Sequence, residues 1–250
     1  MARGDKATPV VDDVIVCGLV PFGDHDAVVR CFGRDAGRVG AFARGARVSR
    51  RRFPGLTAPA LGRASWRPRP GSDLWELCEL DMDTRLAGLG ADLRGWAFAG
   101  YVVELVERCL PEGAPQPEFF AVVVDALTTL ASPRAAHAQA LRAFELHLLA
   151  TLGVLPDLSA VVDEPGQPCV AYDPTSGHLL AHGAPGALAF SDDARRTAWA
   201  LLDGSGRASA PIDEDRLREV AVLFSSWLRR QGMTLRALDV LRSVRASVNL

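Results

Sequence analysis

Arginine side chains gather in one stretch of the sequence, where they could bind phosphate groups. Between residues 30 and 69 the chain has eleven arginines and a single acidic residue, Asp35. The rest of the chain holds only 17 of the 28 basic residues but 29 of the 30 acidic ones. A guanidinium group forks onto phosphate oxygens and also stacks on bases. Because phosphate neutralisation with counterion release supplies most sequence-independent affinity, this charge separation favours a nucleic-acid contact.

The densest part of the basic stretch is a glycine-bounded loop at residues 44–55. We predict that arginines of this loop and of the neighbouring strands follow phosphates with little base preference. These arginines are Arg38, Arg44, Arg47, Arg50, Arg51, Arg52, Arg63 and Arg67. Phe53 and Trp66 could offer faces for base stacking, although positions in a barrel core fit them better. A solvated basic surface without any ligand is the alternative interpretation.

Other residue types that support catalysis or metal binding do not form a recognised pattern. None of the five histidines belongs to a GxSxG elbow, an HExxH pair or a Cys–His arrangement with an orienting group. His178, His182 and Cys169 could be argued as a metal site, but no CxxC pair is present and a fourth ligand is missing. We therefore expect no enzyme activity, no bound metal and no cofactor.

The elements that must position the arginines are short strands between residues 13 and 81. Apolar residues alternate there between turn signals, which predicts five strands. Their expected ranges are 13–20, 27–32, 38–44, 58–67 and 74–80. Five strands in fewer than 80 residues fit a Greek-key barrel of the OB type. An SH3-like barrel fits the strand count nearly as well.

After residue 83 the period of the apolar residues becomes helical. The expected helices cover residues 95–110, 118–131, 133–152, 213–231 and 235–245, with another that starts after Ser191 as N-cap. Residues 156–190 are rich in proline and glycine and should form an irregular insertion with one hairpin around Gly177. The chain is therefore predicted to be an α+β protein. Its expected domains are a barrel (1–83), a helical domain (84–155 and 190–250) and the insertion (156–189).

The apolar runs, the first residues and the cysteine spacing indicate where in the cell we expect this chain. No apolar run reaches the roughly 18–20 residues that cross a bilayer, and the first residues do not fit a signal peptide. The five cysteines are unevenly spaced, which does not indicate a disulfide framework. We expect a cytoplasmic protein.

Four segments, in this order and spacing, resemble the RecO family. Residues 43–53 look like the family's basic segment after the third strand, and residues 20–26 are similar to its first turn. The sequence FELHLLATLGVLPDL at residues 144–158 closely resembles the family's FELRLL…LGY.PDL helix and exit. Residues 235–241 look like its C-terminal LRSR.FL ending. Each segment alone is a weak match to the family, but four matches in this order and spacing are fairly specific for it.

The resemblance implies an N-terminal OB-fold, a helical domain and a small zinc-ribbon-like insertion. It also implies binding to single- and double-stranded DNA, annealing of complementary strands, and loading of RecA onto DNA coated by single-strand-binding protein (SSB). RecR and the acidic SSB tail are the implied partners, a nucleoid-associated location is expected, and a role of RecF stays open. Many family members have CxxC pairs where this chain has residues 161–164 and 180–183. The insertion is therefore predicted to be a degenerate zinc ribbon without metal.

An SSB tail is short and acidic and ends in apolar residues, so its receptor should pair a guanidinium with a shallow apolar groove. Arg142 precedes Phe144 on the helix that best matches the family, and we predict that it contacts the tail carboxylate. An ordinary surface ion pair of Arg142 is the alternative. Two other functions also stay open: an RNA-binding OB module, and an interaction scaffold whose basic loop binds an acidic protein.

Overall fold

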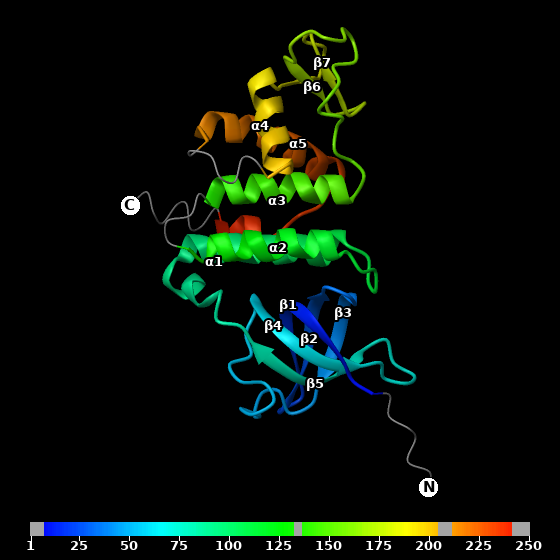
Figure 1. Cartoon of the computed structure of the whole chain (residues 1–250), viewed down its shortest axis with the longest axis vertical. Helices are drawn as coiled ribbons and strands as arrows, with labels where there is room; N and C mark the ends of the chain where they lie inside the picture. The colour runs from blue at the N-terminus through cyan, green and yellow to red at the C-terminus, as the bar shows by residue number, and fades with distance from the viewer. Residues whose placement is uncertain (1–7, 133–136, 205–211, 242–250) are drawn as a thin grey trace. The chain divides into compact units, whose positions relative to one another are not determined.

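The computed structural model describes residues 8–132, 137–204 and 212–241. The chain forms two compact units, one of residues 1–133 with 235–250 and one of residues 134–234 (Figure 1). The division falls inside the stretch that the sequence assigns to one helical domain. The helices that directly follow the barrel therefore belong to the barrel's unit, together with the C-terminal segment.

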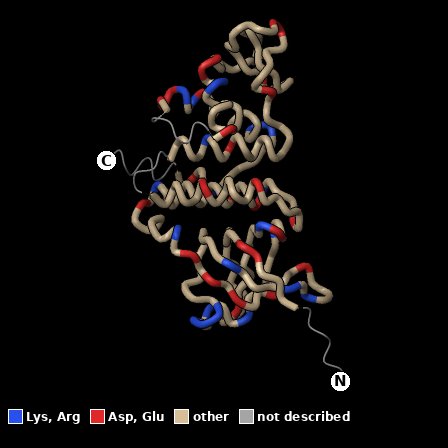
Figure 2. Tube along the Cα trace, viewed as in Figure 1, with Lys and Arg blue, Asp and Glu red and all other residues tan. Residues whose placement is uncertain are grey.

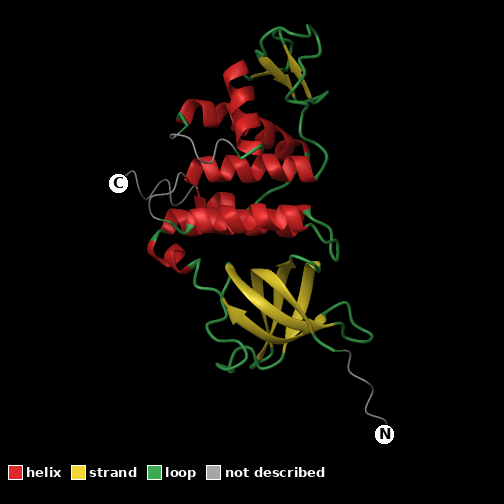
Figure 3. Cartoon of the chain, in the orientation of Figure 1, coloured by secondary structure: helices red, strands yellow, loops and turns green. Residues whose placement is uncertain are grey.

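The first unit contains a closed five-stranded barrel (Figure 3). Its strands are β1 (Val10–Phe22), β2 (Asp26–Gly33), β3 (Gly37–Ala43), β4 (Ala60–Arg67) and β5 (Trp75–Met82). They follow the order β1-β2-β3-β5-β4, in which β3 and β5 pair in parallel and all other neighbours pair antiparallel. The barrel closes because β1 pairs with β2 along its second half and with β4 along its first half. This confirms the predicted OB-like barrel.

Alternating side chains of the strands fill the barrel. On β3, for example, Val39, Ala41 and Ala43 are buried, while the residues between them are partly exposed. Trp66 and Phe53 complete the core and are almost fully buried. The turn into β3 requires glycine at residue 37, because its φ is +71° and a Cβ there would lie 2.4 Å from the Ala114 carbonyl oxygen.

Helices and a capped C-terminal segment complete the first unit. A 3₁₀ helix, η1 (Ala87–Ala91), precedes α1 (Leu93–Cys109) and α2 (Pro117–Leu130). Asp92 caps α1 by accepting a hydrogen bond from the Arg94 backbone N–H at 3.0 Å. The Glu104 carboxylate of α1 accepts hydrogen bonds from the backbone N–H groups of Arg236 (3.0 Å) and Ala237 (2.8 Å). This capping carboxylate starts the short helix at residues 236–241.

The second unit combines three helices with a small sheet. Its helices are α3 (His137–Thr151), α4 (Asp192–Leu202) and α5 (Glu214–Arg230). The sheet has the order β7-β6-β8, built from β6 (Ala171–Asp173), β7 (His178–Leu180) and β8 (Leu188–Ala189). The predicted hairpin is present: Gly177, with φ +78°, lies in the turn between β6 and β7. Ser191 caps α4 as predicted, by accepting a hydrogen bond from the Ala194 N–H.

The α+β class expected from the sequence is confirmed by the barrel and the helices that follow it. Among the residues described, no helix combines the length and the apolar character needed to cross a membrane.

Candidate nucleic-acid interface

The basic loop, which we define as residues 44–57, connects β3 to β4 and is fixed at several points. The Gly45 N–H donates to Asp26 Oδ1 at 2.7 Å, and the Arg47 N–H donates to the His25 carbonyl at 3.0 Å. Further along, the Leu80 N–H of β5 donates to the Arg52 carbonyl at 3.0 Å. The buried Phe53 ring holds the same segment in the barrel core. These contacts give the loop a defined path along the barrel.

The arginines of the basic loop point mainly into solvent. Arg44, Arg47, Arg50 and Arg51 are exposed, and Arg52 is half-buried. Arg52 donates a hydrogen bond to the Arg44 carbonyl at 2.6 Å, and its guanidinium lies 5.2 Å from the Phe53 ring centroid. Figure 2 shows the resulting basic segment at the lower end of the barrel. The structure thus brings five of the predicted phosphate-binding arginines together on one anchored loop.

Three other predicted arginines lie away from this loop and have protein neighbours. The Arg38 guanidinium donates to the Leu110 carbonyl and lies 3.6 Å from Glu112 Oε1. Arg67 forms an ion pair with Glu76 at 2.9 Å, and its side chain is only 16 % exposed. Both groups therefore already have acceptors within the first unit.

Arg63 has a different environment, on the exposed side of β4. The strand register places it opposite Asp13 on β1 and Asp81 on β5. It lines a recess of mixed charge beside α2, together with Arg34 and Arg85 as well as these acids. The neighbouring carboxylates reduce the attraction of Arg63 for phosphate.

The aromatic residues considered for stacking belong to the core. Phe53 is 2 % exposed and Trp66 is fully buried, so neither ring can face a base. Among the described residues of the barrel, the most exposed aromatic residue is Phe22, at the end of β1, which is 60 % exposed. Sequence patterns do not single out Phe22, because the expected first strand ends at residue 20 and leaves Phe22 in the predicted turn. Its position next to the turn at Gly23 is the only signal that the sequence offers.

Arg142 in the second unit lies next to a buried acid. Its Nη1 is 2.8 Å from Glu145 Oε2, one turn further along α3, and the Glu145 side chain is only 3 % exposed. Arg142 itself is 20 % exposed. The guanidinium therefore neutralises a carboxylate that burial would otherwise make costly.

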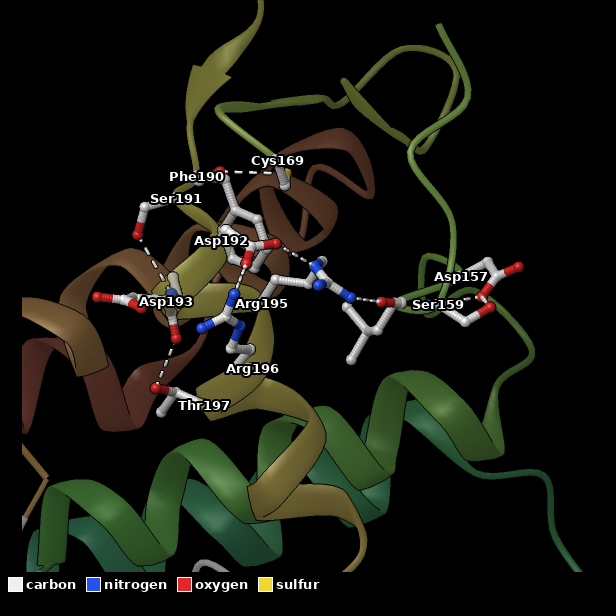
Figure 4. A network of polar contacts seen from close by, with 12 residues as sticks. Asp157, Ser159, Cys169, Phe190, Ser191, Asp192, Asp193, Arg195, Arg196 and Thr197 are labelled. Carbon is white, nitrogen blue, oxygen red and sulfur yellow. Dashed lines mark hydrogen bonds and ion pairs between the residues drawn. The ribbon is translucent and has the colours of Figure 1, made fainter. Parts of the chain in front are cut away.

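Arg196 on α4 is an exposed arginine of the second unit that lies near an aromatic residue, Trp199. Asp192 forms ion pairs with both Arg195 and Arg196 at 2.7 Å (Figure 4). The hydrogen bond from Arg195 is the main reason why the pKa of Asp192 is lowered. Arg195 also donates to the Leu158 carbonyl at 2.7 Å, which joins α4 to the segment after α3. A shallow recess is lined by Leu158, Ser159, Arg195, Arg196 and Trp199. Ser159, Arg196 and Trp199 are exposed, with Arg196 at 71 % (side chain) and Trp199 at 52 %.

The residues considered for metal binding do not form a common site. Cys169 is buried, and its thiol lies 3.2 Å from the Phe190 carbonyl, while His182 Nε2 lies 2.9 Å from Glu164 Oε1. His178 is at the start of β7. Within the described parts of the chain, no three His, Cys, Asp or Glu side chains are placed to hold an ion together. The donor set therefore does not fit zinc.

Hydrogen bonds join residues 161–164 to residues 180–183, the two segments in which the sequence resemblance led us to look for cysteine pairs. The Asp163 carboxylate accepts from the backbone N–H groups of Ala181 (2.6 Å) and His182 (3.2 Å). The Ala181 bond is the main cause that lowers the Asp163 pKa, and the Glu164 carboxylate raises the pKa of His182. These contacts link residues 161–164 to residues 180–183 without a metal.

We expect the purified protein to contain well under one zinc ion per chain, because these segments lack the paired cysteines of a structural zinc site. Elemental analysis measures this directly. A melting temperature that does not change with a chelator is the second expected result, since a structural zinc would contribute folding free energy. Stoichiometric zinc would contradict the prediction.

Comparison with known proteins covers both units. Residues 9–82 match the family described as Recombination protein O N terminal, and residues 90–232 match Recombination protein O C terminal. A DNA repair protein RecO from Anaeromyxobacter sp. (strain K) is 37% identical over 226 residues, which cover 86% of this chain and 88% of that protein. The RecO of Symbiobacterium thermophilum is 31% identical over 252 residues, covering 93% and 98%. The chain therefore belongs to the RecO family of DNA repair proteins.

Proposed function

We propose that this protein binds single- and double-stranded DNA through the basic loop, anneals complementary strands and helps to load RecA onto SSB-coated DNA. The observation that carries the proposal is the set of outward-facing arginines on an anchored loop of an OB-like barrel. Such a loop neutralises phosphates whatever the base sequence. Neutralisation also lowers the repulsion between two strands, which is what annealing requires. The proposal assigns no catalytic residue and places the protein at the nucleoid.

The basic loop has the properties that a sequence-tolerant DNA contact needs. Guanidinium groups offer several donors in a fixed plane and match phosphate oxygens well. Backbone bonds to Asp26, His25 and Leu80 order the loop before any ligand arrives, so less conformational entropy is lost on binding. An RNA-binding module would use the same groups, and a protein scaffold would present them to an acidic partner.

The test is a fluorescence-anisotropy titration of labelled single-stranded DNA, duplex DNA and RNA at several salt concentrations. If about four to six phosphates are contacted, the slope of log affinity against log salt should be roughly −3 to −4 for single strands. Acceleration of annealing between complementary oligonucleotides is the expected activity. Strong preference for RNA would favour the RNA-binding alternative, and negligible binding of any oligonucleotide at physiological salt would favour the scaffold.

We also propose that RecR and the SSB tail are partners, with RecF as a further candidate. The receptor for the tail should pair an available guanidinium with an apolar surface, because the tail is acidic and ends in apolar residues. Arg142 is the sequence-based candidate, but its guanidinium is already paired with Glu145. The recess with Arg196 and Trp199 offers a more exposed guanidinium beside an aromatic ring.

We expect Arg196→Glu to weaken binding of a tail peptide by about 1–2 kcal/mol, because a reversed charge repels the acidic tail. DNA binding should be unchanged, since the basic loop belongs to the other unit. Calorimetric titration with the peptide and anisotropy with DNA, both on the same variant, measure the two effects. Arg142→Glu is the matched charge reversal, and its melting temperature must be followed because it places two carboxylates side by side on α3. Weakening by Arg142→Glu alone would assign the contact to α3 instead.

A further inference from the structure

One part of the barrel's outer surface groups aromatic rings instead of burying them. Phe22 at the end of β1 meets Phe42 on β3 edge-on, with ring centroids 5.6 Å apart. The Arg69 guanidinium, from the turn between β4 and β5, lies 5.4 Å from the centroid of the Phe42 ring. We call these three residues the aromatic patch. Grouped apolar surface of this kind marks a binding site more often than a single exposed ring does.

The surface around the aromatic patch is apolar. The strand register aligns Val20 of β1 and Val28 of β2 with Phe42 of β3 in one row across the sheet. Val20 is 44 % exposed, and Val28 and Phe42 are half-buried. The patch therefore continues over three neighbouring strands, which is an area that can receive a flat ring system.

Phe22 of the aromatic patch shares a recess with residues of the basic loop. Phe22 lines this recess together with His25, Arg44, Val48 and Arg52, and the acidic residues Asp24 and Asp26 line it as well. A strand whose phosphates contact Arg44 and Arg52 therefore has an exposed aromatic ring within its reach. Proteins that bind single strands combine these two features: a cationic track for the backbone and aromatic side chains for the bases.

The segments that form the patch are also those that bind oligonucleotides in OB-type barrels. In such barrels the face of strands 2 and 3 and the loops after strands 1 and 4 contact the ligand. Phe22 is the last residue of β1, Phe42 is on β3, and Arg69 lies in the turn after β4. Three separate segments thus converge on the ligand-binding face of the fold.

We propose that the aromatic patch stacks the unpaired bases of a single-stranded nucleic acid, with Arg69 stacking beside Phe42. The inference rests on the proposed function and deepens it, because it assigns base contacts to residues outside the basic loop. Bases in a duplex are stacked on one another and cannot reach the rings. The patch therefore adds affinity for single strands only, whereas the basic loop binds both forms.

The test compares three labelled ligands: a thymidine oligonucleotide of about 20 residues, an abasic strand of the same length, and a duplex. Phe22→Ala should weaken binding of the thymidine strand about tenfold, the size expected for the loss of one stacking ring. Binding of the abasic strand and of the duplex should stay the same, and so should the salt dependence. Phe42→Ala should act in the same direction, and Phe22→Trp should keep the affinity.

Trp96→Ala is the matched control, because Trp96 is an aromatic residue on α1 with a similar exposure of 45 %. It should leave all three affinities unchanged. The inference would be overturned if Phe22→Ala weakened the binding of all three ligands equally, or weakened none of them. A change in molecular mass by light scattering without a change in DNA affinity would instead make the patch a contact between copies. If wild-type protein binds none of the ligands, the proposed function fails too, whereas an inert Phe22→Ala beside normal wild-type binding refutes the patch alone.

Discussion

Replacing Arg50, Arg51 and Arg52 together by alanine is expected to make the salt dependence of single-strand binding less steep. The slope of log affinity against log salt should become less negative by about 2, because each of the three lost phosphate contacts contributes roughly 0.7. Over the tenfold range from 1 M down to 0.1 M salt, this corresponds to an affinity loss of about 100-fold at 0.1 M. The loss should be the same for all base sequences, because phosphates carry no sequence information. Anisotropy titrations of the triple variant at four or more salt concentrations measure both quantities.

A control for this variant must remove the same charge elsewhere. Arg216, Arg218 and Arg229 on α5 are exposed, and their replacement by alanine lowers the net charge equally. This control should keep the wild-type slope. Arg52 also bonds to the Arg44 carbonyl, so the double variant Arg50→Ala with Arg51→Ala separates lost phosphate contacts from a loosened loop. An unchanged slope in the triple variant would place the DNA site elsewhere.

Phe53→Ala should lower the free energy of unfolding by about 3–5 kcal/mol, because it removes a buried ring and leaves a cavity in the barrel. Phe53 is 2 % exposed and packs in the barrel core, although it belongs to the basic loop. Since domains are stable by only about 5–15 kcal/mol, this is a large part of the total. Denaturant unfolding followed by circular dichroism measures the change.

The same substitution should also weaken DNA binding under conditions where the protein is still folded. The loop would lose the side chain that fixes its middle, and ordering it on the ligand would then cost more entropy. Phe22→Ala is the matched comparison for stability, because Phe22 is 60 % exposed and its loss should leave the unfolding free energy nearly unchanged. Similar stabilities of Phe53→Ala and Phe22→Ala would contradict the role of Phe53 as an anchor.

The barrel and the basic loop could be predicted because their signals are local in the sequence. Alternation of apolar residues and nearby turn residues fix each strand, and the arginines of residues 44–52 are neighbours along the chain. The partners of Arg38 could not be predicted in this way. Leu110 and Glu112 follow it by more than 70 residues, and only the packing of the unit brings them together.

The aromatic patch and the division into units depend on the same kind of distant contact. Phe22 falls in the predicted turn, and nothing in the sequence indicates that its ring lies against Phe42. Arg69 meets Phe42 only after β5 has paired with β3. Helical periodicity predicted the approximate ranges of α1 and α2. It could not predict that these helices group with the barrel, because periodicity does not identify the partner of a face.

The capping of residues 236 and 237 by Glu104 has a consequence for synthesis at the ribosome. The first unit is discontinuous: its chain runs to residue 133, and the last segment returns only after residue 234. Protein chains emerge from the N-terminus, and domains generally fold as units during synthesis. The second unit is continuous and can therefore complete its contacts while Glu104 still lacks the backbone groups that it binds in the finished protein. The first unit thus receives its last contacts only after the whole second unit has been synthesised.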